Sequence, residues 1–229
     1  MSFVNLCKDS VKVISVCKYI KLIIFVLISV SNNLFAHPHA FIEMKAKPLV
    51  EENKLVGFSM LWTLDEMSSA PILYDMQQAK RNPQRLQQLA GEAMGNIVSE
   101  HYFSSLFDRD GKPVKYSAKP KNYGMKAEGN SVSYYFDFML SKPRELSYQE
   151  FTLSTYDPTY YVAMYYDQEQ KNKTSVDFSS LPKNCRGEIL EPNVDEKIRL
   201  YASKLDQSQR NEDDSLGVIF AQKVKLICD

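Results

Sequence analysis

Two of the three histidines of this chain, His37 and His39, flank Pro38. Imidazole nitrogen is a good ligand for zinc, copper and nickel. If the chain were cut after Ala36, His37 could hold one ion with both its α-amine and its imidazole, and His39 would add a third nitrogen. Pro38 has no amide hydrogen to lose, so its nitrogen cannot become a ligand. The sequence therefore predicts a transition-metal site at this terminus that uses side chains.

The third histidine, His101, is needed in one of two alternatives to this site. It follows Ile97 by four residues, near the apolar face of a predicted helix, where a histidine is more often packed than bound to metal. A copper redox site of the histidine-brace type would need His101 as its distant imidazole. A metal-free exported interaction module, in which the histidine pair only decorates the terminus, is the second alternative.

Catalytic signatures are absent from the sequence. It contains no H-E-x-x-H, P-loop, G-x-S-x-G or dinucleotide-binding glycine pattern, and only eight glycines in all. We therefore expect a binding protein and not an enzyme.

The segment before the histidine pair has the features of a secretory signal. Lysines precede the apolar run of residues 22–30, and Ala36 supplies a small residue at the expected cleavage point. A membrane-spanning helix would need about 20 apolar residues, and lysines interrupt the run on its N-terminal side. The prediction is a signal peptide over residues 1–36 and a single periplasmic domain over residues 37–229.

Cleavage changes the charge and the cysteine count. The signal holds four of the 28 basic and one of the 28 acidic residues, which leaves 24 and 27, a net charge of −3. This balance argues against a nucleic-acid partner, which needs a basic face. Cys185 and Cys228 are the two cysteines that remain. In an oxidising compartment a disulfide is the simplest expectation, and a two-thiolate metal site would lack the usual close spacing.

Residue periodicity predicts an α+β fold, dominated by an antiparallel sheet, with one helical insertion at about residues 66–106. Asp65 is a suitable N-cap for the first helix, and Asn82-Pro83 a suitable start for the second. Turn signals occur at Asp110-Gly111 and Gly129-Asn130. The predicted strands cover residues 40–47, 54–64, 129–140, two segments within 149–168 that meet at Asp157-Pro158, and 216–228. The polar region 194–215 fits a solvated helix or a loop.

Four segments carry a family resemblance: "HPHAFIE" after the signal, "WTLDEMSS", "TYDPTYYVA" and "CRGEIL". Together they resemble the DUF1007 family along about residues 37–228. Members of that family are exported, are described as periplasmic components of an ABC-type transport system, and are associated with membrane permeases of the nickel/cobalt type. Zinc-binding members are known. The resemblance therefore implies zinc, with nickel, cobalt or copper as alternatives, and an integral-membrane metal permease as partner.

The resemblance also extends the list of candidate ligands. His37, His39, Asp65 and Asp157 match motif positions, and the late cysteines Cys185 and Cys228 match the family's and support the disulfide. Carboxylates are normal zinc ligands, so either aspartate could complete a tetrahedral site. Each also has a structural explanation, as a helix cap or as a turn residue before proline. This chain lacks the histidine-rich stretch of some members, which favours one site over a high-capacity buffer.

Overall fold

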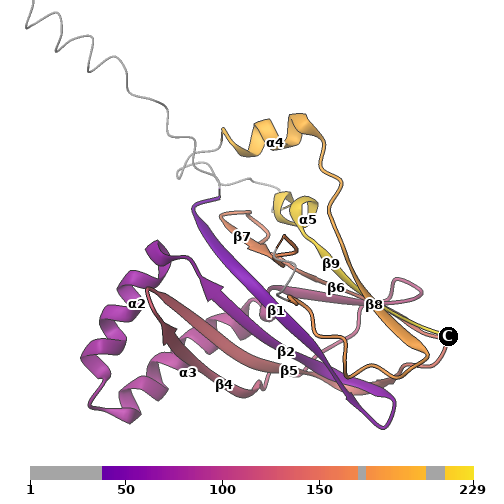
Figure 1. The fold of residues 1–229 in the computed structure, drawn as a ribbon, viewed down its shortest axis with the longest axis horizontal. Coiled ribbons are helices and arrows are strands. Elements are labelled where there is room, and N and C mark those ends of the chain that lie inside the picture. The colour runs from indigo at the N-terminus through magenta and orange to yellow at the C-terminus, as the bar shows by residue number, and fades with distance from the viewer. Residues whose placement is uncertain (1–37, 170–173, 205–214) are drawn as a thin grey trace, which may run out of the picture. The chain divides into compact units, whose positions relative to one another are not determined.

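The computed structural model describes residues 38–169, 174–204 and 215–229, and these belong to one compact unit. Two β-sheets form its body (Figure 1). The five-stranded sheet has the order β4-β5-β2-β1-β7, and the four-stranded sheet has the order β3-β6-β9-β8. All neighbouring strands are antiparallel except β1 and β7, which confirms the expected α+β class with a mainly antiparallel arrangement.

The five-stranded sheet follows the residue alternation of its sequence. Its strands are β1 (Ala40–Glu51), β2 (Lys54–Leu64), β4 (Lys121–Glu128), β5 (Ser131–Glu145) and β7 (Val162–Tyr165). In β1, Met44 and Ala46 are buried whereas Lys45 and Lys47 are half-buried on the opposite face. Glu52 and Asn53 both have positive φ, as the two central residues of a tight hairpin turn require, and they join β1 to β2.

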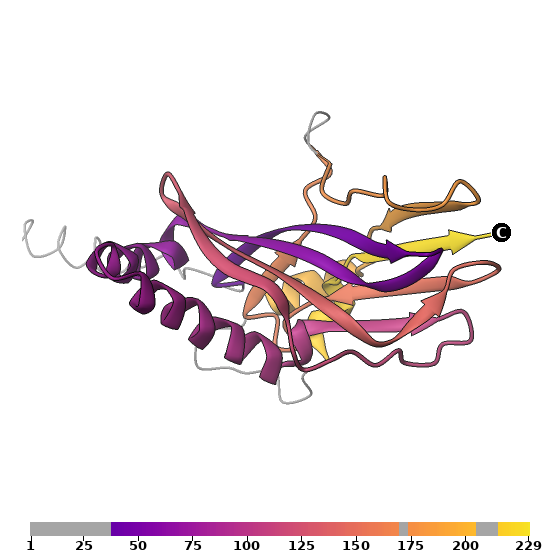
Figure 2. The same ribbon diagram turned by 90° about the horizontal axis from the view of Figure 1, so that it is seen from below.

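The helical insertion is confirmed and ends a few residues earlier than predicted. Helix α2 (Glu66–Ala79) begins after Asp65, and helix α3 (Pro83–Ser99) begins after Asn82. The side chains of Asp65 and Asn82 accept hydrogen bonds from the first turns of these helices. A short turn, η2 (His101–Phe103), follows, and residues 104–106 already belong to β3 (Ser104–Asp108). Figure 2 shows both helices at the end of the molecule away from the four-stranded sheet.

The four-stranded sheet combines β3 with β6 (Glu150–Thr155), β8 (Cys185–Leu190) and β9 (Lys223–Cys228). The two strands predicted on either side of Asp157-Pro158 are present, but β6 lies in this sheet whereas β7 lies in the other. The turn at Asp157-Pro158 therefore carries the chain from one sheet to the other.

The expected closing strand over residues 216–228 is partly wrong. Its first half is helix α5 (Leu216–Phe220), and only its second half is a strand, β9. The Gly217 amide donates to the Pro158 carbonyl at 3.0 Å, and the Phe220 ring stacks on Tyr160 at 4.1 Å. These contacts fix the apolar run as a helix against the crossover turn. In the polar region before it, helix α4 (Glu196–Ala202) forms, and residues 205–214 lie outside the described residues.

Both sheets enclose one aromatic core. Its largest fully buried side chains are Tyr102, Tyr166, Phe58, Phe136, Phe138 and Phe151. Two polar links join the sheets at their sides. The segment 113–117 bonds to β3 and to β5, and the Gln222 amide bonds to both the N–H and the carbonyl of Tyr166.

The predicted disulfide between Cys185 and Cys228 is present and joins β8 to β9. The predicted signal peptide lies outside the described residues. Across the ranges that the structure describes, no helix is both long and apolar enough to cross a membrane.

Candidate functional site

The candidate site lies at the start of β1, where the chain leaves the predicted signal. His39 is the last residue before this strand, and its amide donates to the Tyr161 carbonyl at 2.9 Å. The imidazole and the Tyr161 ring are 4.8 Å apart, at an interplanar angle of 37°. The parallel pairing of Ala40 with Val162 continues this contact into β7. His39 is thus held by the fold, whereas His37 lies outside the described residues.

Asp65 approaches the same end of β1 from the start of α2. Its carboxylate accepts hydrogen bonds from the Phe41 amide at 2.7 Å and from the Ser68 amide and hydroxyl at 2.8 and 2.9 Å. In return the Asp65 amide donates to the Phe41 carbonyl. Partial burial raises the pKa of this carboxyl, but the hydrogen bonds from Ser68 and Phe41 outweigh it and hold the pKa below its ordinary value. Asp65 therefore caps α2 and also holds the start of β1 in place.

Asp157 approaches from the crossover turn. It is buried, with 9% of its surface exposed, and its carboxylate accepts from the amide and hydroxyl of Thr159 and from the Val162 amide. Aspartate before proline commonly closes such a turn on its own backbone. Because Val162 pairs with Ala40, Asp157 helps to hold the strand that flanks the start of β1.

Three of the predicted site residues therefore contact the paired starts of β1 and β7. His39 bonds to Tyr161, Asp65 to Phe41 and Asp157 to Val162. Figure 1 shows the start of β1, β7 and α5 at this end of the molecule. Each carboxylate nevertheless makes local hydrogen bonds, and in the described ranges no three histidine, cysteine or acidic side chains are grouped closely enough to hold a metal. A metal held by three such side chains at this end would need at least one ligand from outside the described residues, where His37, the predicted one, lies.

His101 lies elsewhere, on an exposed turn with unusual backbone geometry. His101, Tyr102 and Phe103 have φ values of 51°, 58° and 48°, so three consecutive residues adopt the left-handed conformation. Each such residue costs about 1–2 kcal/mol, and burial of Tyr102 helps to offset the cost. The Tyr102 ring is 1% exposed, and its hydroxyl donates to the Ser117 carbonyl at 2.8 Å. The expected position of His101 on the apolar face of a helix is wrong, because α3 ends at Ser99.

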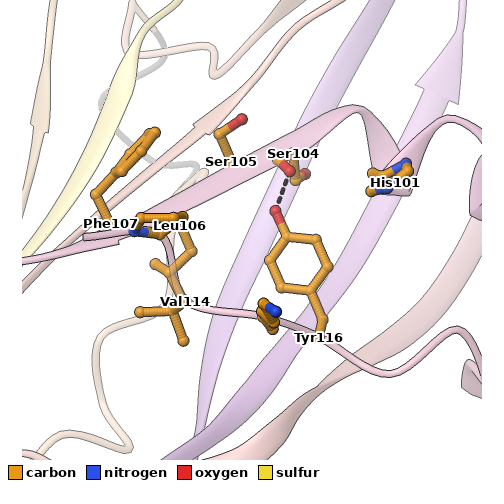
Figure 3. A pocket seen from close by; sticks show the side chains of 9 residues that line it. His101, Ser104, Ser105, Leu106, Phe107, Val114 and Tyr116 are labelled. Carbon is orange, nitrogen blue, oxygen red and sulfur yellow. Dashed lines mark hydrogen bonds between the residues drawn. The ribbon is translucent and has the colours of Figure 1, made fainter. Parts of the chain in front are cut away.

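His101 lines a cavity of about 510 Å³ beside the edge of β3 (Figure 3). The other lining residues are Ser104, Ser105, Leu106, Phe107, Pro113, Val114, Lys115 and Tyr116. The Tyr116 hydroxyl donates to the Ser104 carbonyl and so takes the place of a neighbouring strand. Burial raises the pKa of Tyr116 to about 12, although a backbone hydrogen bond from Leu106 acts to lower it. The hydroxyl is therefore protonated at neutral pH and can donate. No motif in the sequence points to this cavity, because its residues come from separate segments.

Comparisons with known proteins agree with the resemblance seen in the sequence. Residues 22–228 match a family described as "Protein of unknown function (DUF1007)". A relative from Haemophilus influenzae, described as an uncharacterized protein, is 55% identical over 200 residues. The match spans 87% of this chain and 95% of the relative. No solved structure matches. The chain belongs to the DUF1007 family.

Proposed function

We propose that this chain is an exported periplasmic protein that binds a divalent transition metal and serves a membrane metal permease of the nickel/cobalt type. Zinc is the first candidate, and nickel, cobalt and copper are alternatives. The observation that supports a metal site most directly is the position of His39. Its backbone is fixed by the bond to Tyr161, so the last residue of the His-Pro-His stretch is anchored at the start of β1. The permease and the preference for zinc rest on the family resemblance.

The proposed ligands are the α-amine and imidazole of His37 and the imidazole of His39. A tetrahedral zinc ion would take a fourth ligand from a nearby carboxylate or from water. Asp65 is the better of the two protein candidates, because it is half-buried and bonds to Phe41, two residues beyond His39. Asp157 is buried and closes its own turn, so its release would cost more.

The test is zinc titration of the mature protein, beginning at His37, against a competing chelator. We expect one equivalent of zinc to bind, and affinity to fall at least tenfold, about 1.4 kcal/mol, in each of His37→Ala and His39→Ala. A variant with one alanine added before His37 should also bind more weakly, because the added residue moves the α-amine away from the His37 imidazole. Circular dichroism of each variant checks that the fold is intact.

His101→Ala is the matched control, because this exposed histidine lines a separate cavity. It should bind zinc like the wild type. Loss of copper binding in this variant would instead favour the histidine-brace alternative. If the wild type takes up none of the four metals, the proposal is wrong and the metal-free interaction module takes its place.

A further inference from the structure

The outer edge of β8 presents both backbone hydrogen-bonding groups and charged side chains. β8 is the last strand of the four-stranded sheet (Figure 2). The Cys228 amide donates to Gln149, on the β6 side of β9, at 2.9 Å. The N–H and carbonyl groups of successive residues in a strand point to opposite sides. Ile227 and every second residue before it in β9 therefore bond to β8, where their partners are Arg186, Glu188 and Leu190. The N–H and carbonyl groups of Gly187 and Ile189 therefore point out of the sheet.

These outward amides are unpaired within the described part of the chain. Among the described residues, none accepts a hydrogen bond from the Gly187 or Ile189 amide. The Cys185 amide already donates to the Pro182 carbonyl, so only the Cys185 carbonyl is available at that position. The inner face of β8 is filled by the Phe178 ring, which lies where a Cβ atom of Gly187 would stand. The disulfide holds β8 against β9 and so fixes the position of this edge.

The side chains of β8 carry opposite charges on either side of Gly187. Arg186 and Glu188 are exposed on the outer face, and neither takes part in an ion pair within the described part of the chain. Lone charges on an edge strand commonly prevent pairing with other sheets. Here, however, an antiparallel copy of the same strand, centred on Gly187, would place every arginine opposite a glutamate.

We propose that β8 pairs with β8 of a second copy of this chain, antiparallel and centred on Gly187. Gly187 exchanges both of its backbone bonds with Gly187 of the second copy, and the Ile189 amide donates to the Cys185 carbonyl of that copy. Arg186 lies directly opposite Glu188 of the second copy at a position without ladder hydrogen bonds, where cross-strand side chains approach most closely. The two four-stranded sheets become one continuous sheet.

A single pair of short strands makes a small interface, so the dimer is weak and concentration-dependent. Its ion pairs are exposed, so added salt weakens it further. The proposal does not depend on the metal site, and its test is made with a chelator present.

The experiment is sedimentation of the mature protein over a wide range of concentrations, up to the highest attainable, because a small interface makes a weak dimer. The wild type should shift from monomer to dimer as concentration rises. Arg186→Glu and Glu188→Arg each place like charges opposite each other, and we expect each variant alone to associate at least tenfold more weakly. An equimolar mixture of the two should recover association, since every glutamate then faces an arginine, and so should the doubly substituted chain with both charges exchanged.

Ile189→Pro tests the backbone contact separately. Proline removes an N–H that points away from β9, so the internal ladder stays complete while the bond to the second copy is lost. An unchanged thermal midpoint would show that this variant folds. Lys121→Glu, on the edge strand of the other sheet, is the charge control and should sediment like the wild type. A wild type that is monomeric throughout, or a mixture that associates no better than its components, would overturn the proposal.

Discussion

Asp65 combines two functions in one carboxylate. It caps α2 through Ser68 and holds β1 through the Phe41 amide. The same bonds stabilise its charged form and lower its pKa against the effect of burial. Both roles depend on a charged acceptor that the neighbouring backbone groups can share.

Replacement of Asp65 by alanine should lower the free energy of unfolding at neutral pH by about 1–2 kcal/mol, the usual cost of a lost helix cap. A carboxyl with a lowered folded-state pKa contributes stability above its ordinary value of 3.8, and this is lost as pH falls through the folded-state pKa. The difference between wild type and variant should therefore shrink in acid. Denaturant unfolding of wild type and variant, at neutral pH and again in acid, measures this difference in the free energy of unfolding. Glu66→Gln, at an exposed neighbour, is the control, and an Asp65→Ala effect that is independent of pH would contradict the charge-based part of the argument.

Individual residues were predictable where their chemistry is local. The helix cap at Asp65 and the turn at Asp157-Pro158 follow from side-chain bonds to nearby amides, and both are present. The left-handed turn at His101–Phe103 was not predictable, because burial of Tyr102 by distant strands helps to offset its local cost. Whether His37 and His39 bind metal stays a prediction.

At the scale of elements, α5 shows how a glycine can define a contact. A Cβ atom at Gly217 would overlap the carbonyl oxygen of Asp157, and the Gly217 amide donates to the Pro158 carbonyl. The helix therefore touches the crossover turn by its backbone. The sequence pattern of 216–220 is apolar and short, and such runs do not distinguish a strand from a buried helix.

Gly217→Ala should destabilise the fold by about 1–3 kcal/mol, the usual cost of overpacking, because α5 must move away from the turn. Gly91→Ala in α3 is the matched control. Apart from the nearby backbone of α3 itself, no atom lies within 4 Å of the Cβ that it would add. Alanine is also the better helix former, so this variant should stabilise the fold by about 0.5–1 kcal/mol. Thermal unfolding of both variants compares them. Equal effects in the two would mean that the contact between Gly217 and Asp157 is unimportant for stability.

For the molecule as a whole, most strands were predictable, but β3, β4 and β8 were missed, and the partners of the strands were not predictable. Alternation located β1 and β2 closely, since it reports which face of a strand is buried. It carries no information on which strand lies next to which. The separation of β6 and β7 into different sheets, and the parallel contact of β7 with β1, emerge only from the packing of both sheets around the aromatic core.

The disulfide acts at this largest scale. It closes a loop between residues 43 positions apart, and it joins β8 to the last strand of the chain. Its reduction should lower the free energy of unfolding by about 3–4 kcal/mol, chiefly because the unfolded chain gains freedom. Denaturant unfolding with and without reductant measures the change, and the Cys185→Ser/Cys228→Ser double variant should match the reduced protein. An unchanged midpoint on reduction would contradict this account.

The place of β1 between β2 and β7 sets an order for folding. β1 is the first strand of the described chain, yet its neighbour β7 begins only at Val162. Contacts between distant segments form late, because the intervening chain must first be brought together. The backbone bond that fixes His39 therefore waits until Tyr161 has been made and has joined the same sheet. The start of the domain becomes rigid only when most of the chain has arrived.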